Sequence, residues 1–199
     1  MSSEANEVVR LYRRHARAWT RARGARLTEK QWLDRFAELL PPCAHVLDIG
    51  CGSGDPIARY LVEQGYRVTG VDSSPEMVDM FRANFPEQAS TVSDMRSLQL
   101  GRHFDGLLAW DSFFHLDFDD QRAMFRVFGE HAGFGAPLMF TSGPTEGEAI
   151  GTLEGEPLYH ASLAPSEYVA LIKAAGFEVV AHAAEDPTCG GRTIWLARR

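Results

Sequence analysis

The chain has 199 residues, of which 45% are hydrophobic and 24% are charged, and its formal net charge is −7. This length and composition are typical of one globular domain and exclude a disordered, fibrous or solenoid chain. The negative charge opposes the attraction to phosphate that dominates non-specific nucleic-acid binding, so we expect no DNA or RNA partner. The longest apolar runs fall far short of the roughly 20 residues that span a bilayer, and we expect neither a membrane partner nor a signal peptide.

The cysteines indicate the redox environment in which the protein works. Cys43, Cys51 and Cys189 are odd in number and have no metal-ligand spacing. We therefore expect neither a disulfide framework nor a metal site, which fits a reducing, cytoplasmic location.

The N-terminal part is predicted to be helical. Apolar residues recur near the 3.6-residue period through residues 4–40, with a break expected at Gly24, and two prolines follow at positions 41 and 42. We interpret residues 1–42 as a helical cap on a single domain that covers residues 1–199. The arginines crowded into this segment fit a solvated helical face, or one or two of them reach a ligand carboxylate.

Beyond the cap, short apolar segments alternate with helical ones. A cap-and-proline helix start is expected at Asp55-Pro56, and residues 142–161 are glycine-rich and are expected to form an irregular loop or lid. The alternation predicts an α/β fold with a single doubly wound, mostly parallel sheet and helices on both faces. Strands are expected at 45–49, 66–71, 89–93, 104–110, 137–141, 177–182 and 193–197, and helices after Pro56 and at 75–84, 117–131 and 165–175.

The most informative motif follows the first predicted strand and reads Asp48-Ile49-Gly50-Cys51-Gly52-Ser53-Gly54. Its glycines let the backbone approach a ligand closely, and the next helix offers unpaired N–H groups. A dinucleotide motif needs its third glycine one position later, and Asp48 would repel a pyrophosphate. An ammonium group would instead be held, so the pocket suits a nucleoside that carries an amino-acid tail.

With these features the chain resembles class I S-adenosylmethionine-dependent methyltransferases of the compact, small-molecule type, over nearly its whole length. Four segments carry the resemblance in family order: the glycine loop 48–54, the second strand 68–72, the segment 93–96 and the fourth strand 104–112. The resemblance implies a Rossmann-like, seven-stranded fold. It also implies S-adenosyl-L-methionine as cofactor and S-adenosyl-L-homocysteine as product.

Cofactor-binding residues follow from the same resemblance. Asp72 is expected to hold both ribose hydroxyls, and Asp94 to accept from the adenine amine. A helix cap for Asp72 and a turn residue for Asp94 are the ordinary alternatives. The residues implied are Asp48, Gly50, Cys51, Gly52, Gly54, Asp72, Ser73, Met77, Asp94, Met95, Trp110 and Asp111.

Candidate catalytic residues are two histidines. The sulfonium methyl is already activated, so no metal is required, but an oxygen or nitrogen acceptor can need a base, and histidine titrates nearest to neutral pH. His115 directly follows the fourth strand, and His160 lies in the segment 142–161. Packing or helix capping is the alternative for His115, and an ordinary loop contact is the alternative for His160.

The acceptor is expected to be a small molecule, because no additional domain and no Asp-Pro-Pro-Tyr motif of amino-methylating DNA enzymes is present. Tyr12 and Trp19 lie two helical turns apart, a spacing that core packing also produces, and Arg23 is a further candidate near the methionine tail. The predicted substrate-binding residues are Tyr12, Arg17, Trp19, Phe114 and Tyr159.

Two other functions compete with methyl transfer. A non-catalytic binder of S-adenosylmethionine, acting as a sensor or assembly partner, stays open because a fold does not determine a function. A nicotinamide-dependent reductase is disfavoured by the glycine spacing and by Asp48. The identity of the acceptor and the oligomeric state are left open.

Overall fold

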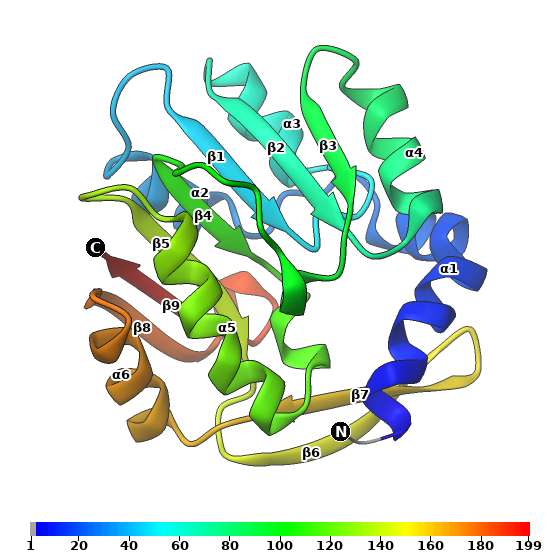
Figure 1. The fold of residues 1–199 in the computed structure, drawn as a ribbon. Helices are drawn as coiled ribbons and strands as arrows, with labels where there is room; N and C mark the ends of the chain where they lie inside the picture. The colour runs from blue at the N-terminus through cyan, green and yellow to red at the C-terminus, as the bar shows by residue number, and fades with distance from the viewer. Residues whose placement is uncertain (1–2) are drawn as a thin grey trace.

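A computed structural model of the chain describes residues 3–199, so residues 1 and 2 of the predicted cap lie outside the described part. The main sheet has the strand order β3-β2-β1-β4-β5-β9-β8, and β6 pairs with β7 in a separate hairpin (Figure 1). The strands span His45–Ile49 (β1), Arg67–Asp72 (β2), Ala89–Val92 (β3), Gly106–Ala109 (β4), Pro137–Ser142 (β5), Gly147–Leu153 (β6), Glu156–Ser162 (β7), Glu178–Asp186 (β8) and Arg192–Arg198 (β9).

The predicted seven-stranded, mostly parallel sheet is confirmed. Strands β1 to β5 are mutually parallel, whereas β9 runs antiparallel to β5 and to β8. From β1 the chain proceeds outward to β2 and β3, and it then returns to the other side of β1 with β4. Ligands of such sheets bind where the strand order reverses, which is here at the carboxyl ends of β1 and β4.

Helices cover both faces of the sheet. In Figure 1, α5 and α6 lie in front of the strands, and α2 and α3 lie behind them. Alternate residues of β1 divide between the two cores: Val46 packs with α2, α3 and α4, and Leu47 and Ile49 pack with α5 and α6. The helices span Ser3–Arg23 (α1), Lys30–Ala37 (α2), Ile57–Glu63 (α3), Pro75–Asn84 (α4), Phe118–His131 (α5) and Pro165–Ala174 (α6), with 3-10 turns at Met95–Ser97 (η1), Phe113–His115 (η2) and Pro187–Cys189 (η3).

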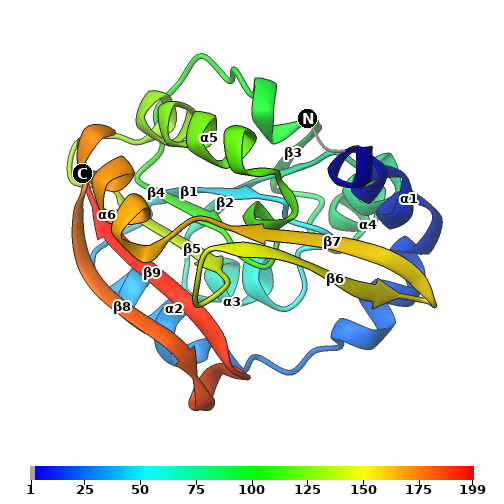
Figure 2. The same cartoon turned by 90° about the horizontal axis from the view of Figure 1, so that it is seen from below.

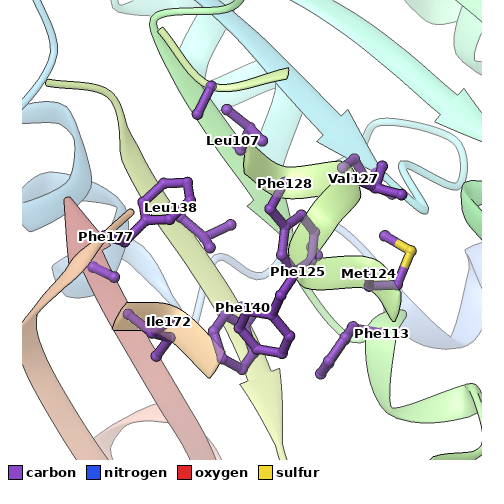
Figure 3. Close-up of a cluster of buried hydrophobic side chains, with 14 of the residues drawn as sticks. Leu107, Phe113, Met124, Phe125, Val127, Phe128, Leu138, Phe140, Ile172 and Phe177 are labelled. Carbon is purple, nitrogen blue, oxygen red and sulfur yellow. The ribbon is translucent and has the colours of Figure 1, made fainter. Parts of the chain in front are cut away.

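Aromatic rings dominate the core beneath α5 and α6. Phe140 of β5 lies at the centre of this cluster, with ring centroids 5.2 Å from Phe113, 5.8 Å from Phe125 and 5.6 Å from Tyr168 (Figure 3). Rings at these separations contribute beyond their buried area, and the cluster anchors the turn after β4 to the sheet.

A third, smaller core joins α1 to the β6–β7 hairpin. Val8 and Leu11 of α1 pack on Leu158, Tyr159 and Ala161 of β7. In Figure 2, which looks from below, the hairpin crosses in front of the main sheet and reaches α1. The cap and the hairpin therefore close over the edge where ligands of this sheet type bind.

The expectation of an irregular loop at residues 142–161 is wrong, because this segment contains most of the hairpin. Glu154 and Gly155 form its two-residue turn with positive φ values of 51° and 81°, the combination that matches the twist of paired strands. The frequent glycines concealed the strand signal, because they interrupt the alternation of apolar residues in the exposed strand β6.

A second correction concerns the start of α3. Asp55 does not cap this helix, which begins at Ile57 without a side-chain cap. Its carboxylate pairs instead with Arg59, Oδ1 to Nε at 2.5 Å. By contrast, the hydroxyl of Ser74 accepts the amide of Met77 at 3.3 Å and caps α4.

Replacing the ring at the centre of the main core should be costly. We expect Phe140→Ala to lower the free energy of unfolding by about 3–5 kcal/mol, the usual range when a buried aromatic ring leaves a cavity. Urea denaturation measures this change, with Phe134→Ala as the matched control because the Phe134 side chain is fully exposed. Equal effects of the two substitutions would contradict the described core.

Candidate functional site

Three adjoining clefts lie at the carboxyl ends of β1, β2 and β4. The central cleft is lined by the glycine loop, the ends of β2 and β3, the turn after β4, and α1. The glycine-loop cleft extends from it past residues 48–55 towards the C-terminal end of α1. The hairpin cleft opens on the other side, between the turn after β4, the β6–β7 hairpin and the start of β9.

Asp72 closes β2 and faces the central cleft. Its Oδ2 accepts the amide of Gly52 at 3.0 Å, and its Oδ1 accepts the amide of Ser74 at 2.9 Å. Burial raises the pKa of this carboxyl, although the backbone hydrogen bonds oppose the change. Asp72 thus supports the local turn while it lines the cleft, and the alternative of a helix cap is wrong because Ser74 caps α4.

The glycines of the loop serve different purposes. A Cβ on Gly50 would overlap the Cβ of Ser112 at 2.2 Å, so this position lets the turn after β4 approach β1. A Cβ on Gly54 would overlap Phe85 at 2.4 Å, so this position lets α4 pack. A Cβ on Gly52 would come within 4 Å only of the sulfur of Met77 among the described residues, at 3.9 Å, so this position leaves backbone without a side chain at the central cleft.

The segment after β3 brings Asp94 and Met95 to the central cleft. Asp94 Oδ1 accepts the amide of Arg96 at 2.9 Å, and the Arg96 guanidinium bonds both carboxylate oxygens. Burial alone would raise the pKa of Asp94, but the hydrogen bonds from Arg96 outweigh burial and lower it. Asp94 is thus an anion that already has a strong partner.

The glycine-loop cleft is acidic at its base. Asp48 is buried, and burial together with the charge of Asp72 raises its pKa to about 7. Arg23, at the end of α1, reaches the same cleft while pairing with the fully buried Glu29. Cys51 also lines this cleft, and burial raises the pKa of its thiol.

The turn after β4 contributes Trp110 and Asp111. The indole Nε1 of Trp110 is buried and makes no hydrogen bond with the described residues. Asp111 adopts a positive φ of 48°, and Arg192 binds its carboxylate with Nε at 2.9 Å from Oδ1 and Nη2 at 2.6 Å from Oδ2. Asp111 lines all three clefts, so the Asp111–Arg192 pair stands at their junction.

His115 is buried between α1 and β7. Its Nδ1 lies 2.8 Å from the carbonyl oxygen of Tyr159, which only accepts, so Nδ1 carries the proton. Its Nε2 lies 2.9 Å from the hydroxyl oxygen of Tyr12 and accepts a hydrogen bond from that hydroxyl. Burial lowers the pKa of His115 to about 3, so the ring is neutral near pH 7. The predicted general base is therefore placed to accept a hydrogen bond rather than to hold a proton.

His160 lies on the hairpin cleft beside His115, with ring centroids 4.8 Å apart, and beside Phe114 at 5.3 Å. Burial lowers its pKa as well. The structure thus brings both predicted histidines and Phe114 to one wall, which also contains Tyr12 and Trp19.

Two predicted substrate residues lie elsewhere. Arg17 is exposed and lines none of the three clefts, because it is on a different face of α1 from Tyr12, Trp19 and Arg23, whose spacings of seven and four keep one helical face. Tyr159 neighbours His160 in a strand, so its side chain points the other way and packs against α1. Near the clefts Tyr159 contributes the backbone carbonyl that holds His115 and a hydroxyl that donates to Glu148, one of the residues that line the hairpin cleft.

Arg192 was missed by the sequence reasoning. It is the first residue of β9, 81 residues after Asp111, and it reaches the clefts only because β9 returns beside β5. Its local signal is the turn Gly190-Gly191 before a strand, and that turn alone does not indicate a site.

Residues 3–199 contain no group of three or more His, Cys, Asp or Glu side chains that could hold a metal ion. Within the same described range, no helix combines the length and apolarity needed to cross a membrane.

Comparison with protein families matches residues 46–131 to a family described as a methyltransferase domain. A curated relative, an O-methyltransferase of Pyrenophora dematioidea, is 30% identical over 104 residues, which are 48% of this chain and 38% of that protein. The chain therefore spans about two fifths of the length of that relative.

Solved structures resemble nearly the whole chain. The 1,6-didemethyltoxoflavin-N1-methyltransferase of Burkholderia thailandensis, bound to S-adenosylhomocysteine, superimposes with a TM-score of 0.75 at 20% identity and covers 100% of this chain and 91% of its own. A SAM-bound amino pentose methyltransferase from Micromonospora echinaspora has a TM-score of 0.72 at 21% identity and covers 92% and 95%. These likenesses confirm the predicted Rossmann-like fold.

The raised pKa of Asp48 predicts a pH-dependent stability. Between about pH 4 and pH 7 the unfolded chain ionises this carboxyl while the folded chain keeps it protonated, so its contribution to stability falls as pH rises and is constant above about 7. Asp48→Asn should remove this part of the slope, which is at most about 1.4 kcal/mol per pH unit. Urea denaturation from pH 5 to 8 measures it, and parallel curves for the two proteins would refute the assignment.

Proposed function

We propose that the protein methylates a small-molecule acceptor at nitrogen or oxygen. The premise is that residues 46–131 match a methyltransferase-domain family and that the chain has the fold of S-adenosylmethionine-dependent methyltransferases. S-adenosyl-L-methionine is the proposed methyl donor and S-adenosyl-L-homocysteine the product. Residues 1–199 act as one domain in this proposal, and its cytoplasmic location stays a prediction from composition.

The observation that carries the proposal is a pair of acids beside the glycine loop: the buried Asp48 at its start, and the half-buried Asp72 at the end of β2. Asp72 faces the central cleft beside the bare backbone of Gly52, and Asp48 lies at the base of the glycine-loop cleft. A carboxylate accepts from hydroxyl and ammonium groups but repels phosphate. The clefts therefore fit a nucleoside with a cationic tail better than a dinucleotide.

Each part of that ligand has candidate partners. Asp72 and Ser73 would bind the ribose, and Met77, Asp94 and Met95 would lie against the adenine ring. The carboxylate oxygens of Asp94 already accept hydrogen bonds from Arg96, so Asp94 would accept a hydrogen bond from the adenine amine in addition to these.

The tail has partners of both signs. Asp48 would hold the ammonium group, while Arg23 and the unpartnered indole N–H of Trp110 would face the carboxylate. Together with the bare backbone at Gly52, this donor and acceptor set matches the chemistry of an amino-acid tail.

When bound there, S-adenosyl-L-methionine supplies a methyl group that its sulfonium charge has already activated. The protein then needs to bind and orient an acceptor and to exclude water. Tyr12 and Trp19 of α1 line both the central and the hairpin clefts, so they lie at the boundary between the two clefts. The hairpin cleft provides the acceptor space.

The non-catalytic alternative gains no support. The relatives described above are named as methyltransferases, and the open hairpin cleft beside the central cleft leaves room for a second substrate. A binder that served only as a sensor would not need that space.

Calorimetric titration with S-adenosyl-L-methionine and with S-adenosyl-L-homocysteine tests the proposal. We expect micromolar binding of both and no binding of a nicotinamide dinucleotide. Asp72→Ala should weaken binding by about 100-fold, because two hydrogen bonds to a charged group are lost.

Asp79→Ala is the matched control for that experiment, since Asp79 is an exposed carboxylate on α4 outside the three clefts. Asp72→Asn keeps the size of the side chain and separates loss of charge from collapse of the turn. Unchanged affinity in both Asp72 variants, or tighter binding of the dinucleotide, would sink the proposal.

A further inference from the structure

Tyr12 stands at the boundary between the central and hairpin clefts, and its hydroxyl has a defined hydrogen-bond direction. The hydroxyl proton is donated to Nε2 of His115, whose Nδ1 proton is committed to the carbonyl of Tyr159. Burial and the charges of Asp111 and Asp72 raise the pKa of Tyr12, so the hydroxyl stays protonated. With its one proton in use, the Tyr12 oxygen can offer only lone pairs to a further partner.

The hairpin cleft carries surplus negative charge. Among the described residues that line it, Arg192 is the only permanently cationic side chain, and Asp111 neutralises it. Glu146 and Glu148 are exposed and line this cleft, and Oε1 of Glu148 accepts the hydroxyl of Tyr159 at 2.5 Å, which leaves its negative charge in place. An acceptor carboxylate would meet no unpaired cation there and two repelling acids, whereas an ammonium group would be attracted.

His115 and His160, the two histidines that line the hairpin cleft, are poor general bases. Burial lowers the pKa of both His115 and His160, and Nε2 of His115 is already filled by Tyr12. An alcohol needs to lose its proton as it attacks, so it gains little from these rings. A neutral amine attacks with its own lone pair and keeps its protons until the new bond has formed.

We propose that the acceptor is a primary or secondary amine that enters the hairpin cleft and donates an N–H to the hydroxyl oxygen of Tyr12. His115 is a positioning residue, because it keeps the lone pairs of that oxygen available to the acceptor. This inference rests on the proposed function and names the substrate class of the same site.

The transfer balances without a protein base. An acceptor that arrives as an ammonium ion first releases one proton to water, which gives the neutral amine. The lone pair of that neutral nitrogen forms the N–C bond as the C–S bond of the methyl donor breaks, and the electron pair of the C–S bond stays on sulfur. The nitrogen is then cationic and releases one proton to water.

A matched set of probes tests the acceptor class. Benzylamine, benzyl alcohol and benzoate share one ring and differ in the polar group. Their binding at pH 7 is measured by ligand-observed NMR on the protein saturated with S-adenosyl-L-homocysteine. We expect benzylamine to bind at least tenfold more tightly than benzoate, with benzyl alcohol in between.

Substitutions test which residues cause the expected preference for benzylamine over benzoate. Tyr12→Phe should weaken benzylamine binding at least fivefold, and the double variant Glu146→Gln, Glu148→Gln should reduce its advantage over benzoate. Tyr66→Phe is the control, since Tyr66 lies between α3 and β2, outside the hairpin cleft. Benzoate binding as tightly as benzylamine, or no benzylamine binding while S-adenosyl-L-homocysteine binds, would overturn this inference alone. Failure of S-adenosyl-L-homocysteine to bind would instead overturn the proposed function on which it rests.

The imidazole nitrogens of His115 give a second readout that does not depend on turnover. In ¹⁵N NMR spectra we expect a protonated Nδ1 and an unprotonated, hydrogen-bonded Nε2. The Nε2 resonance should shift in Tyr12→Phe and when benzylamine binds. A protonated Nε2 in the wild type, or an Nε2 resonance indifferent to Tyr12→Phe, would overturn the positioning role.

Discussion

The hydrogen-bond chain from Tyr12 through His115 to the carbonyl of Tyr159 is the interaction on which the site depends. It joins α1, the turn after β4 and β7, which are separated by 103 and 44 residues in sequence. Because both ring nitrogens of a neutral, buried histidine are used, neither neighbour can shift without leaving a polar group unpaired, a loss of about 1–3 kcal/mol. The small apolar core between α1 and the hairpin supports the same closure. The boundary between the central and hairpin clefts is thus held by a few specific contacts.

The charged side chains suit the three clefts to two different ligands, the proposed methyl donor and the proposed acceptor. Asp48 begins the glycine loop and Asp72 accepts the amide of Gly52 within that loop, so the two acids would favour a cationic nucleoside, while Arg192 neutralises Asp111 where the clefts meet. Glu146 and Glu148, which line the hairpin cleft, would then favour an acceptor with a positive charge over one with a negative charge. Burial opposes ionisation of Asp48 in the free protein, and an ammonium group beside it would offset that cost. Binding of the amino-acid tail is in this way coupled to the protonation of Asp48.

Much of the fold could be predicted because its signals are local. The apolar run before Gly50, the cap at Ser74 and the alternation of strands and helices each depend on neighbouring residues, and the sheet followed from them. The hairpin was missed because glycines break its alternation, and Arg192 was missed because only the antiparallel return of β9 brings it to Asp111. Arg17 lies on the predicted helix, but helical phase turns its side chain away from the clefts. Tyr159 lies in a segment predicted as an irregular loop, and the strand alternation that turns its side chain towards α1 exists only because that segment is a hairpin. The chemistry of His115 depends on burial and on two distant partners, which no local pattern contains.

A crystal structure of the complex with S-adenosyl-L-homocysteine tests the central claim most directly. The account predicts that the ribose hydroxyls bind the carboxylate of Asp72 and that the amino-acid tail lies in the glycine-loop cleft between Asp48 and Arg23. It also predicts that the sulfur faces the hairpin cleft near Tyr12. A nucleoside bound in the hairpin cleft, or a tail directed away from Asp48, would contradict the account.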